Sequence, residues 1–248
     1  MGQGWLNITI YPETKGGNGM KKGLAMVLAV MMVLLSAACS HQEEKTDTKQ
    51  TVSGEKETQI VEEATVYVPK GFSLGEINGQ TYENTFVKIG CRLPEGWEYR
   101  PLKELGEEVG IHWSLEGDAL VQSFLEKELF LVMAASRGQS RCIIALEKMD
   151  NEKLDTLDIT MHDQEEIQAI EESFAKLEGV QDPVMELGTV MLDGKTFDCI
   201  HGNMTRNGEE MVLYSITIKC DGYLATLTLT IPSTEDQKEF LDCFYLLK

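Results

Sequence analysis

Three Asp-Gly or Asn-Gly dipeptides divide the last third of the chain into segments separated by short turns. They are Asp193-Gly194, Asn207-Gly208 and Asp221-Gly222. Such pairs favour tight hairpin turns because both central residues can adopt a positive φ. The segments between them predict strands over 184–192, 195–205, 209–220 and 223–231. Since consecutive hairpins force antiparallel pairing, this part of the chain predicts an antiparallel meander.

Apolar runs upstream of the meander indicate further strands. Leu129–Ala135 and Cys142–Leu146 flank the turn sequence Arg137-Gly138-Gln139, which predicts another hairpin. From residue 87 to residue 93, apolar residues alternate with other residues, the period of a strand that buries one face. The apolar residues of this run are Val87, Ile89, Cys91 and Leu93.

Helical spacing of apolar residues predicts helices before and after the meander. Two of them are expected over 102–109 and 115–127. The clearest helix starts after Asp163 and ends before Gly179, with an apolar face made of Ile167, Ile170, Phe174 and Leu177. A last helix is expected to be capped by Ser233 or Thr234 and to carry on one face Phe240, Cys243, Phe244 and Leu247. Together these elements predict an α+β fold, an antiparallel sheet of about six to seven strands packed between helices.

Residues 20–38 have the order of a bacterial export signal. Met20-Lys21-Lys22 is positively charged, and the apolar run after it ends at Leu35-Ser36-Ala37-Ala38-Cys39. The run is shorter than the about 20 residues that cross a bilayer and suits a signal peptide. Small residues before a cysteine resemble a lipobox, although Ser36 stands where leucine is usual. The resemblance implies cleavage after Ala38 and lipidation of Cys39. The alternatives are cleavage after Ala38 by the general signal peptidase, or an uncleaved anchor.

The rest of the chain divides around this signal. Because Met20 opens a better signal peptide than Met1, residues 1–19 are interpreted as a translated leader. Residues 39–64 are interpreted as the lipidated cysteine and a disordered acidic tether, since large apolar residues are nearly absent there. Residues 65–248 then form a single domain. Acyl chains on Cys39 would hold this domain at the extracytoplasmic face of the cell membrane.

The charge balance excludes one large class of partner. The chain has 41 acidic and 22 basic side chains and a formal net charge of -19. Phosphate backbones require a basic stripe, which the sequence lacks, so nucleic acid is not an expected partner. The same excess of acid argues against charge-driven docking on anionic lipids, so the expected membrane contact is the lipid anchor alone.

Two short motifs in the first part of the domain resemble a known group of proteins. They are Gly79-Gln80-Thr81-Tyr82-Glu83-Asn84, followed by Phe86, and Leu93-Pro94-Glu95-Gly96-Trp97. The sequence resembles lipobox-bearing, surface-exposed proteins with a PsbP-like fold, and the order of elements agrees over residues 72–248. The resemblance implies an antiparallel α/β/α sandwich and a non-enzymatic adaptor or binding role, and it supplies no catalytic residues. Trp97 itself is expected to be a core residue.

Five cysteines remain if Cys39 is lipidated: Cys91, Cys142, Cys199, Cys220 and Cys243. An odd number without close spacing is a poor disulfide framework, so buried free thiols are expected. If the turn at Asn207-Gly208 places Thr205 opposite Glu209, then Cys199 faces Ser215, too far from Cys220 for a disulfide or a shared zinc site. Pairing of Cys91 with Cys142 stays open at this point.

Cys199 and His201 form the one sequence pattern that suggests covalent catalysis. Residues two apart on a strand share a face, so a thiol and an imidazole could form a nucleophile–base pair. Their side chains would run parallel, however, and Cβ atoms about 6–7 Å apart do not bring the reacting atoms together. A structural role is therefore the expectation for both, and neither a catalytic residue, a metal site nor a cofactor is predicted.

These observations predict a lipid-anchored, extracytoplasmic, non-catalytic domain that binds a protein partner or assists envelope assembly. A solute- or cation-binding lipoprotein is the alternative. A surface enzyme that uses Cys199 and His201 is a third hypothesis.

Overall fold

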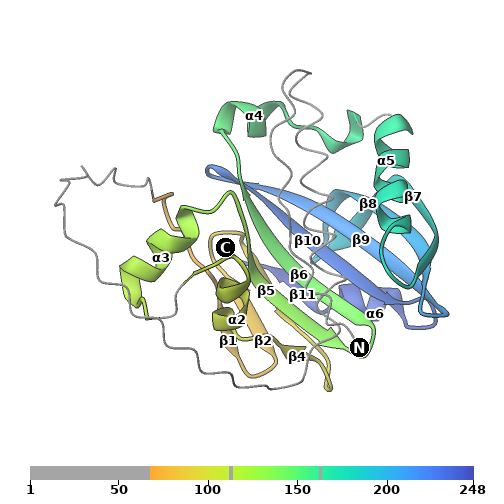
Figure 1. The fold of residues 1–248 in the computed structure, drawn as a ribbon, viewed down its shortest axis with the longest axis horizontal. Helices are drawn as coiled ribbons and strands as arrows, with labels where there is room; N and C mark the ends of the chain where they lie inside the picture. Colours follow the sequence, from red (N-terminus) through yellow and green to blue (C-terminus); the bar gives the residue numbers. More distant parts are fainter. Residues whose placement is uncertain (1–67, 112–113, 162–163) are drawn as a thin grey trace, which may run out of the picture.

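The computed structural model describes residues 68–111, 114–161 and 164–248 (Figure 1). The predicted leader, the signal peptide with its cleavage site at Ala38, the lipidation site at Cys39 and the tether lie outside the described residues. Within the described ranges, every helix is too short or too polar to cross a membrane.

Seven antiparallel strands form the main sheet, in the spatial order β4-β5-β6-β10-β9-β8-β7. Their bounds are β4 Glu98–Tyr99, β5 Leu129–Arg137, β6 Ser140–Lys148, β7 Val180–Leu192, β8 Lys195–Arg206, β9 Glu209–Cys220 and β10 Tyr223–Pro232. The predicted meander is confirmed as β7 to β10, and the predicted upstream hairpin as β5 and β6. Because β10 pairs with β6, the two units join into one sheet.

The turns of the meander differ in backbone geometry. Both residues of Asp193-Gly194 and of Asn207-Gly208 have a positive φ, whereas in the third turn only Gly222 does. The Asn207-Gly208 turn is closed by Arg206 opposite Glu209, so Cys199 faces Ile216. The predicted register, with Thr205 opposite Glu209, is therefore wrong by one residue. The physical reason is that two left-handed residues complete the turn, and the flanking residues form its closing pair.

A second antiparallel sheet covers one face of the main sheet, with strand order β1-β2-β3-β11. Its strands are β1 Glu76–Asn78, β2 Thr81–Asn84, β3 Ile89–Arg92 and β11 Phe244–Leu246. The predicted strand around residue 89 is confirmed as β3, and the apolar residues on its predicted inner face are buried. The sequence did not predict that the C-terminus would return to pair with this strand.

The expected C-terminal helix is wrong in its cap and its extent. The helix α6 covers only Gln237–Leu241, and the Asp236 carboxylate accepts a hydrogen bond from the Glu239 backbone N–H at 3.0 Å. Phe244 lies opposite Cys91 in the β11–β3 ladder. The apolar spacing suggested one helical face, but Phe240 and Phe244 reach the same core from a helix and from a strand.

Helices cover the other face of the main sheet near its two ends. The helix α5, Gln164–Ala175, packs on β7, and α2, Leu102–Glu108, packs on β5 (Figure 1). Ile170 and Phe174 of α5 are buried, as its periodicity predicts, while Asp163 lies outside the described residues. The remaining helical segments are α3 Gly117–Leu125, α4 Asn151–Thr156 and the short 3-10 helix η1 Ile159–Met161. The α+β class with a seven-stranded antiparallel sheet is confirmed, and one of its faces is covered largely by strands.

Two apolar clusters, one on each face of the main sheet, form the core. Trp97 is 1% exposed and belongs to the larger cluster, where its ring stacks on Phe240 with centroids 5.1 Å apart. The guanidinium of Arg137 lies 5.6 Å from the centroid of the same ring. The structural interpretation of Trp97 is therefore confirmed.

Candidate binding surface on strands β7 to β9

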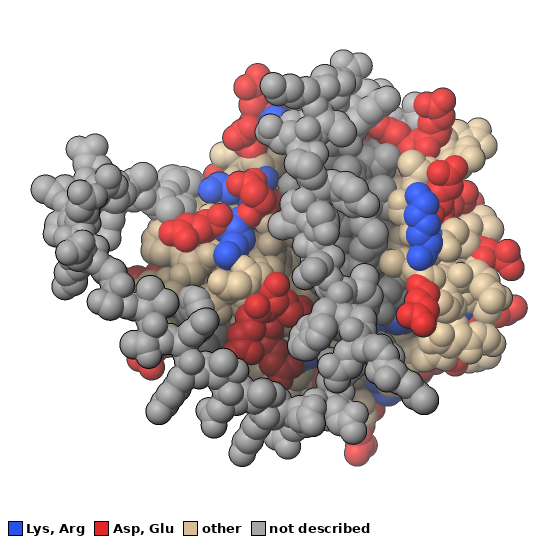
Figure 2. Space-filling model, viewed as in Figure 1, with Lys and Arg blue, Asp and Glu red and all other residues tan. Residues whose placement is uncertain are grey.

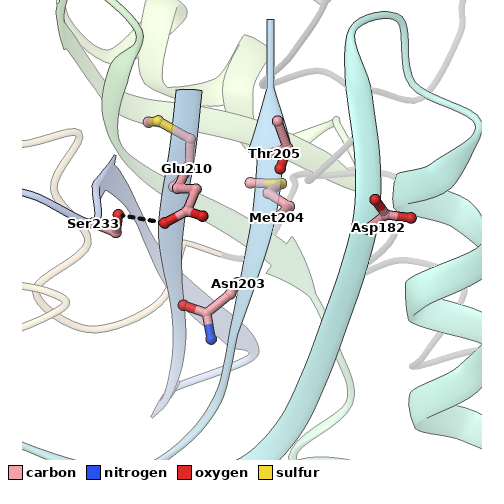
Figure 3. A pocket seen from close by; sticks show the side chains of 7 residues that line it. Asp182, Asn203, Met204, Thr205, Glu210 and Ser233 are labelled. Carbon is pink, nitrogen blue, oxygen red and sulfur yellow. Dashed lines mark hydrogen bonds between the residues drawn. The ribbon is translucent and has the colours of Figure 1, made fainter. Parts of the chain in front are cut away.

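A recess of about 210 Å³ lies where β7, β8 and β9 meet the segment after β10. Its walls are formed by Asp182, Asn203, Met204, Thr205, Glu210, Met211 and Ser233. Figure 3 shows the Glu210 carboxylate directed toward Ser233, with Asp182 on the other side of β8. The Ser233 hydroxyl lies 3.4 Å from Glu210 Oε2, and the Ser233 backbone N–H donates to the Glu210 carbonyl at 2.8 Å.

The shape of this recess follows from an irregularity in β7. The β7–β8 register shifts between Gln181 and Val184, and Asp182 in this bulge has a φ of 49°. Asp182 tolerates this left-handed conformation better than most residues do. The residues that line the recess offer two carboxylates, two hydroxyls, an amide and two thioethers. In the described ranges, no three His, Cys, Asp or Glu side chains gather closely enough to hold a metal ion.

The Cys199 and His201 side chains have different surroundings. Cys199 is fully buried in the larger core cluster, and burial together with the nearby Asp198 carboxylate raises the pKa of its thiol to about 11. His201 is half-buried, its Nε2 lies 3.5 Å from Glu186 Oε1, and its ring stacks on Tyr214 with centroids 6.2 Å apart. Because its pKa is raised, the Cys199 thiol is almost entirely protonated at neutral pH, so Cys199 beside His201 is not an activated nucleophile.

His201 is part of a layer of side chains that links the outer strands to α6. Its ring lies over Gly188, where an added Cβ would be 2.4 Å from His201 Nε2. Tyr214 donates a hydrogen bond of 2.6 Å to Gln237 Oε1 at the start of α6. The glycine in the middle of β7 therefore lets the imidazole lie close to the strand, and it is not part of a turn.

The other thiols among the described residues are also free. Cys91, Cys142 and Cys199 are buried, and Cys220 and Cys243 are half-buried. Burial raises the pKa of Cys91 to about 11, although its sulfur lies 3.4 Å from the Tyr99 hydroxyl. The pairing of Cys91 with Cys142 that the sequence left open is not present, and the buried thiols pack as small apolar side chains.

Exposed apolar side chains on β7 are the feature that the sequence did not predict. Val184 is 61% exposed and Met191 is 64% exposed. Among the described residues, the other large apolar side chains of this kind are Val68 and Ile77, which lie outside the main sheet. Residue alternation could identify β7 as a strand, but it could not show that no strand in the described part of the chain pairs with its outer edge.

Charged side chains of both signs are mixed on the described surface that Figure 2 shows. On the coloured part of the face seen in Figure 2, acidic side chains outnumber basic ones and lie beside them. Arg100 contacts Glu108 at 2.7 Å, and Arg137 contacts Glu235 at 2.6 Å. Each of these two arginines is therefore paired with a carboxylate.

Comparison with known proteins shows fold similarity at low sequence identity. No protein-family model matches the chain, and no curated protein matches it. Cyanobacterial PsbP (CyanoP) from Synechocystis sp. PCC 6803 is 12% identical, with 70% of this chain and 98% of that chain covered and a TM-score of 0.40. LpqN from Mycobacterium tuberculosis, a protein involved in cell envelope biogenesis, is 14% identical, with 62% and 76% covered and a TM-score of 0.30.

A third solved structure, from Bacteroides thetaiotaomicron VPI-5482, is 10% identical, with 69% of this chain and 50% of that chain covered and a TM-score of 0.31. None of these similarities assigns a function to this chain.

Proposed function

We propose that this protein is a non-catalytic domain that is anchored to the extracytoplasmic face of the cell membrane by lipid on Cys39 and that binds a protein partner. The anchor rests on the sequence of residues 20–39. The binding role rests on one observation, the exposure of Val184 and Met191 on the same outer strand. These two side chains are seven positions apart and lie on opposite faces of β7, so they flank the edge of the sheet rather than form one patch. Exposed apolar side chains on an edge strand favour contact with another chain.

Several features favour a protein partner over a small solute. The recess beside β7 has a volume of about 210 Å³, below the roughly 300–1,000 Å³ of most small-molecule sites. Its two carboxylates, Asp182 and Glu210, come from opposite walls, and calcium requires six or more converging oxygens. The apolar side chains on β7 lie along a strand rather than around a cavity, which suits a macromolecular contact.

Site-specific photo-crosslinking in the native cell tests this proposal. A photoreactive residue is placed at position 184 or 191 of the full-length lipoprotein, and a third variant carries it at position 77. Ile77 is a matched control because it is 43% exposed and apolar but belongs to β1 of the other sheet. We expect one shared protein adduct from positions 184 and 191 that position 77 does not give. Absence of an adduct, or the same adduct from all three positions, would contradict the proposed surface.

The anchor has a separate test. Replacement of Cys39 by Ala should abolish incorporation of a labelled fatty acid and release the protein from the membrane fraction. Unchanged labelling of the Cys39→Ala variant would show that Cys39 is not the lipidation site.

A further inference from the structure

The outer edge of β7 has backbone N–H and C=O groups that form no hydrogen bonds with another strand of the described sheet. The strand is the last in the spatial order of the main sheet, with β8 on its inner side. The two-residue turn at Asp193-Gly194 makes Leu192 and Lys195 the hydrogen-bonded closing pair. Because bonded and non-bonded pairs alternate in an antiparallel ladder, Leu187, Thr189 and Met191 direct their N–H and C=O groups away from β8.

A hydrogen bond from Met185 confirms which residues of β7 direct their backbone groups away from β8. Met185 belongs to the same alternating set, and its N–H donates to Glu171 Oε1 of α5 at 2.8 Å. The helix therefore covers the edge as far as Met185. From Leu187 to Met191, no hydrogen bond to the outward groups is found among the described residues. Thr189 and Met191 are exposed there.

β11 contacts β7, and the Leu246 N–H donates to Asp193 Oδ2 at 2.9 Å just after the strand. The part of β7 from Leu187 to Leu192 nevertheless lacks the features that usually protect sheet edges. Short edge strands, charged side chains, prolines and bulges prevent unwanted pairing in most proteins. The other edge strands of the two sheets, β4, β1 and β11, have only two or three residues. In β7, Pro183 and the bulge lie at the start of the strand, whereas the sequence from Leu187 to Leu192 contains neither charge nor proline.

The side chains along this edge define the chemistry of its occupant. Leu187 lies against the apolar cluster beneath α5, and Met191 shares its face by alternation. On the opposite face, the Glu186 side chain is 71% exposed. The chain as a whole carries a net charge of -19. A second copy would bring the same negative charge to the edge, whereas a basic segment would be attracted.

We propose that β7 binds its partner by β-strand addition, in which an extended segment with alternating apolar and basic residues pairs with Leu187, Thr189 and Met191. Main-chain hydrogen bonds provide affinity in this type of recognition, and alternate side chains provide specificity. The apolar side chains of the segment lie beside Leu187 and Met191, and its basic side chains lie beside Glu186. This inference rests on the proposed function and specifies how the same surface binds.

A synthetic nonapeptide of alternating valine and lysine, with blocked ends, is the probe for this mode of binding. Its affinity is measured by fluorescence anisotropy for the full-length lipoprotein in detergent micelles. Thr189→Pro removes one outward N–H without removing a β8 hydrogen bond, and Thr189→Ala is the matched control that keeps the backbone donor. We expect Thr189→Pro to weaken binding at least tenfold and Thr189→Ala to change it less than twofold. Equal affinities of these two variants would overturn the proposal.

Two further measurements do not depend on how Thr189→Pro folds. N-methylation of all valines or of all lysines blocks opposite edges of the peptide, so one set should abolish binding and the other should leave it nearly intact. In the unmodified protein, amides of Leu187, Thr189 and Met191 should exchange rapidly and slow at least tenfold with peptide, while those of Gly188 and Val190 stay unchanged.

Three outcomes of these measurements would overturn strand addition. The first is an equal effect of the two methylation sets on binding. The second is protection of the outward amides in the free protein, which would show that its own chain covers the edge, and the third is amide protection that rises with protein concentration, which would show that a second copy covers it. The crosslinks from positions 184 and 191 could persist in each case, which separates failure of this inference from failure of the proposed function.

Discussion

Replacing Gly202 with alanine should displace β7 from β8, because the two strands meet there without space for a side chain. A Cβ at position 202 would lie 2.2 Å from the Val184 carbonyl oxygen and 3.1 Å from Met185 Cα. Carbon contacts are normally about 3.5–4.0 Å, so the backbone of β7 would have to move by more than about 1 Å. Overpacking of this kind costs about 1–3 kcal/mol.

Gly188 provides the matched control within the same hairpin. A Cβ there would meet the His201 ring at 2.4 Å, but a side chain can rotate away whereas a carbonyl in a ladder cannot. Alanine in place of glycine also restricts the unfolded chain, which contributes about 0.4–1 kcal/mol of stability where the native backbone accepts it. We therefore expect Gly202→Ala to lose about 1–2 kcal/mol and Gly188→Ala to lie within about 0.5 kcal/mol of the unmodified protein.

Urea unfolding followed by circular dichroism measures both changes, and thermal unfolding provides a second readout at about 2–4 °C per kcal/mol for a domain of this size. An unchanged free energy of unfolding for Gly202→Ala would refute the close approach of β7 to β8. A larger loss for Gly188→Ala than for Gly202→Ala would refute the argument that the movable ring distinguishes the two sites.

Two other predictions follow from buried titratable groups. In the folded protein at neutral pH, N-ethylmaleimide should modify Cys220 and Cys243 slowly. It should modify Cys91, Cys142 and Cys199 only after unfolding, because burial hides these thiols and raises their pKa values. Mass spectrometry of the alkylated peptides checks this, and rapid labelling of Cys199 in the folded protein would contradict it. Burial and the nearby Glu128 carboxylate raise the pKa of Glu147 to about 7 from an ordinary value of 4.5. The folded state therefore binds this proton more tightly than the unfolded state does, and the stability that protonation provides is lost as the pH rises from about 4.5 through 7. Glu147→Gln should be more stable than the unmodified protein at pH 8 by roughly 2–3 kcal/mol, with a smaller difference at pH 5. Urea unfolding at the two pH values tests this, and an equal difference at both would show that Glu147 does not titrate in this way.

Local sequence signals predicted the strands of the meander but placed one of them in the wrong register. Asn207 and Gly208 adopt the positive φ angles that their residue types favour, so the turn position was predictable. Whether a turn closes on Thr205 or on Arg206 depends on the backbone path through it, and that choice moves Cys199 from Ser215 to Ile216 as its neighbour. The candidate site could be predicted only in part for the same reason. His201 was identified in the sequence, whereas the position of Glu186 beside it depends on the register of the β7–β8 ladder.

The C-terminal segment shows why apolar spacing alone could not assign every element. Phe240 and Phe244 are four residues apart, which fits a helical face. In the structure, Cys243 lies after the end of α6, and its carbonyl accepts a hydrogen bond from the Arg92 N–H at 2.9 Å, which joins the chain to β3. A strand partner more than 150 positions away in the sequence leaves no local signal.

The sequence by itself determined the antiparallel meander, the hairpin of β5 and β6 and the burial of Trp97, because each depends on turn chemistry or side-chain size within a few residues. Only the tertiary structure decided that β10 pairs with β6, which leaves β7 at the edge of the sheet. That pairing joins apolar faces from distant segments, so the exposure of Val184 and Met191 is a property of the assembled sheet.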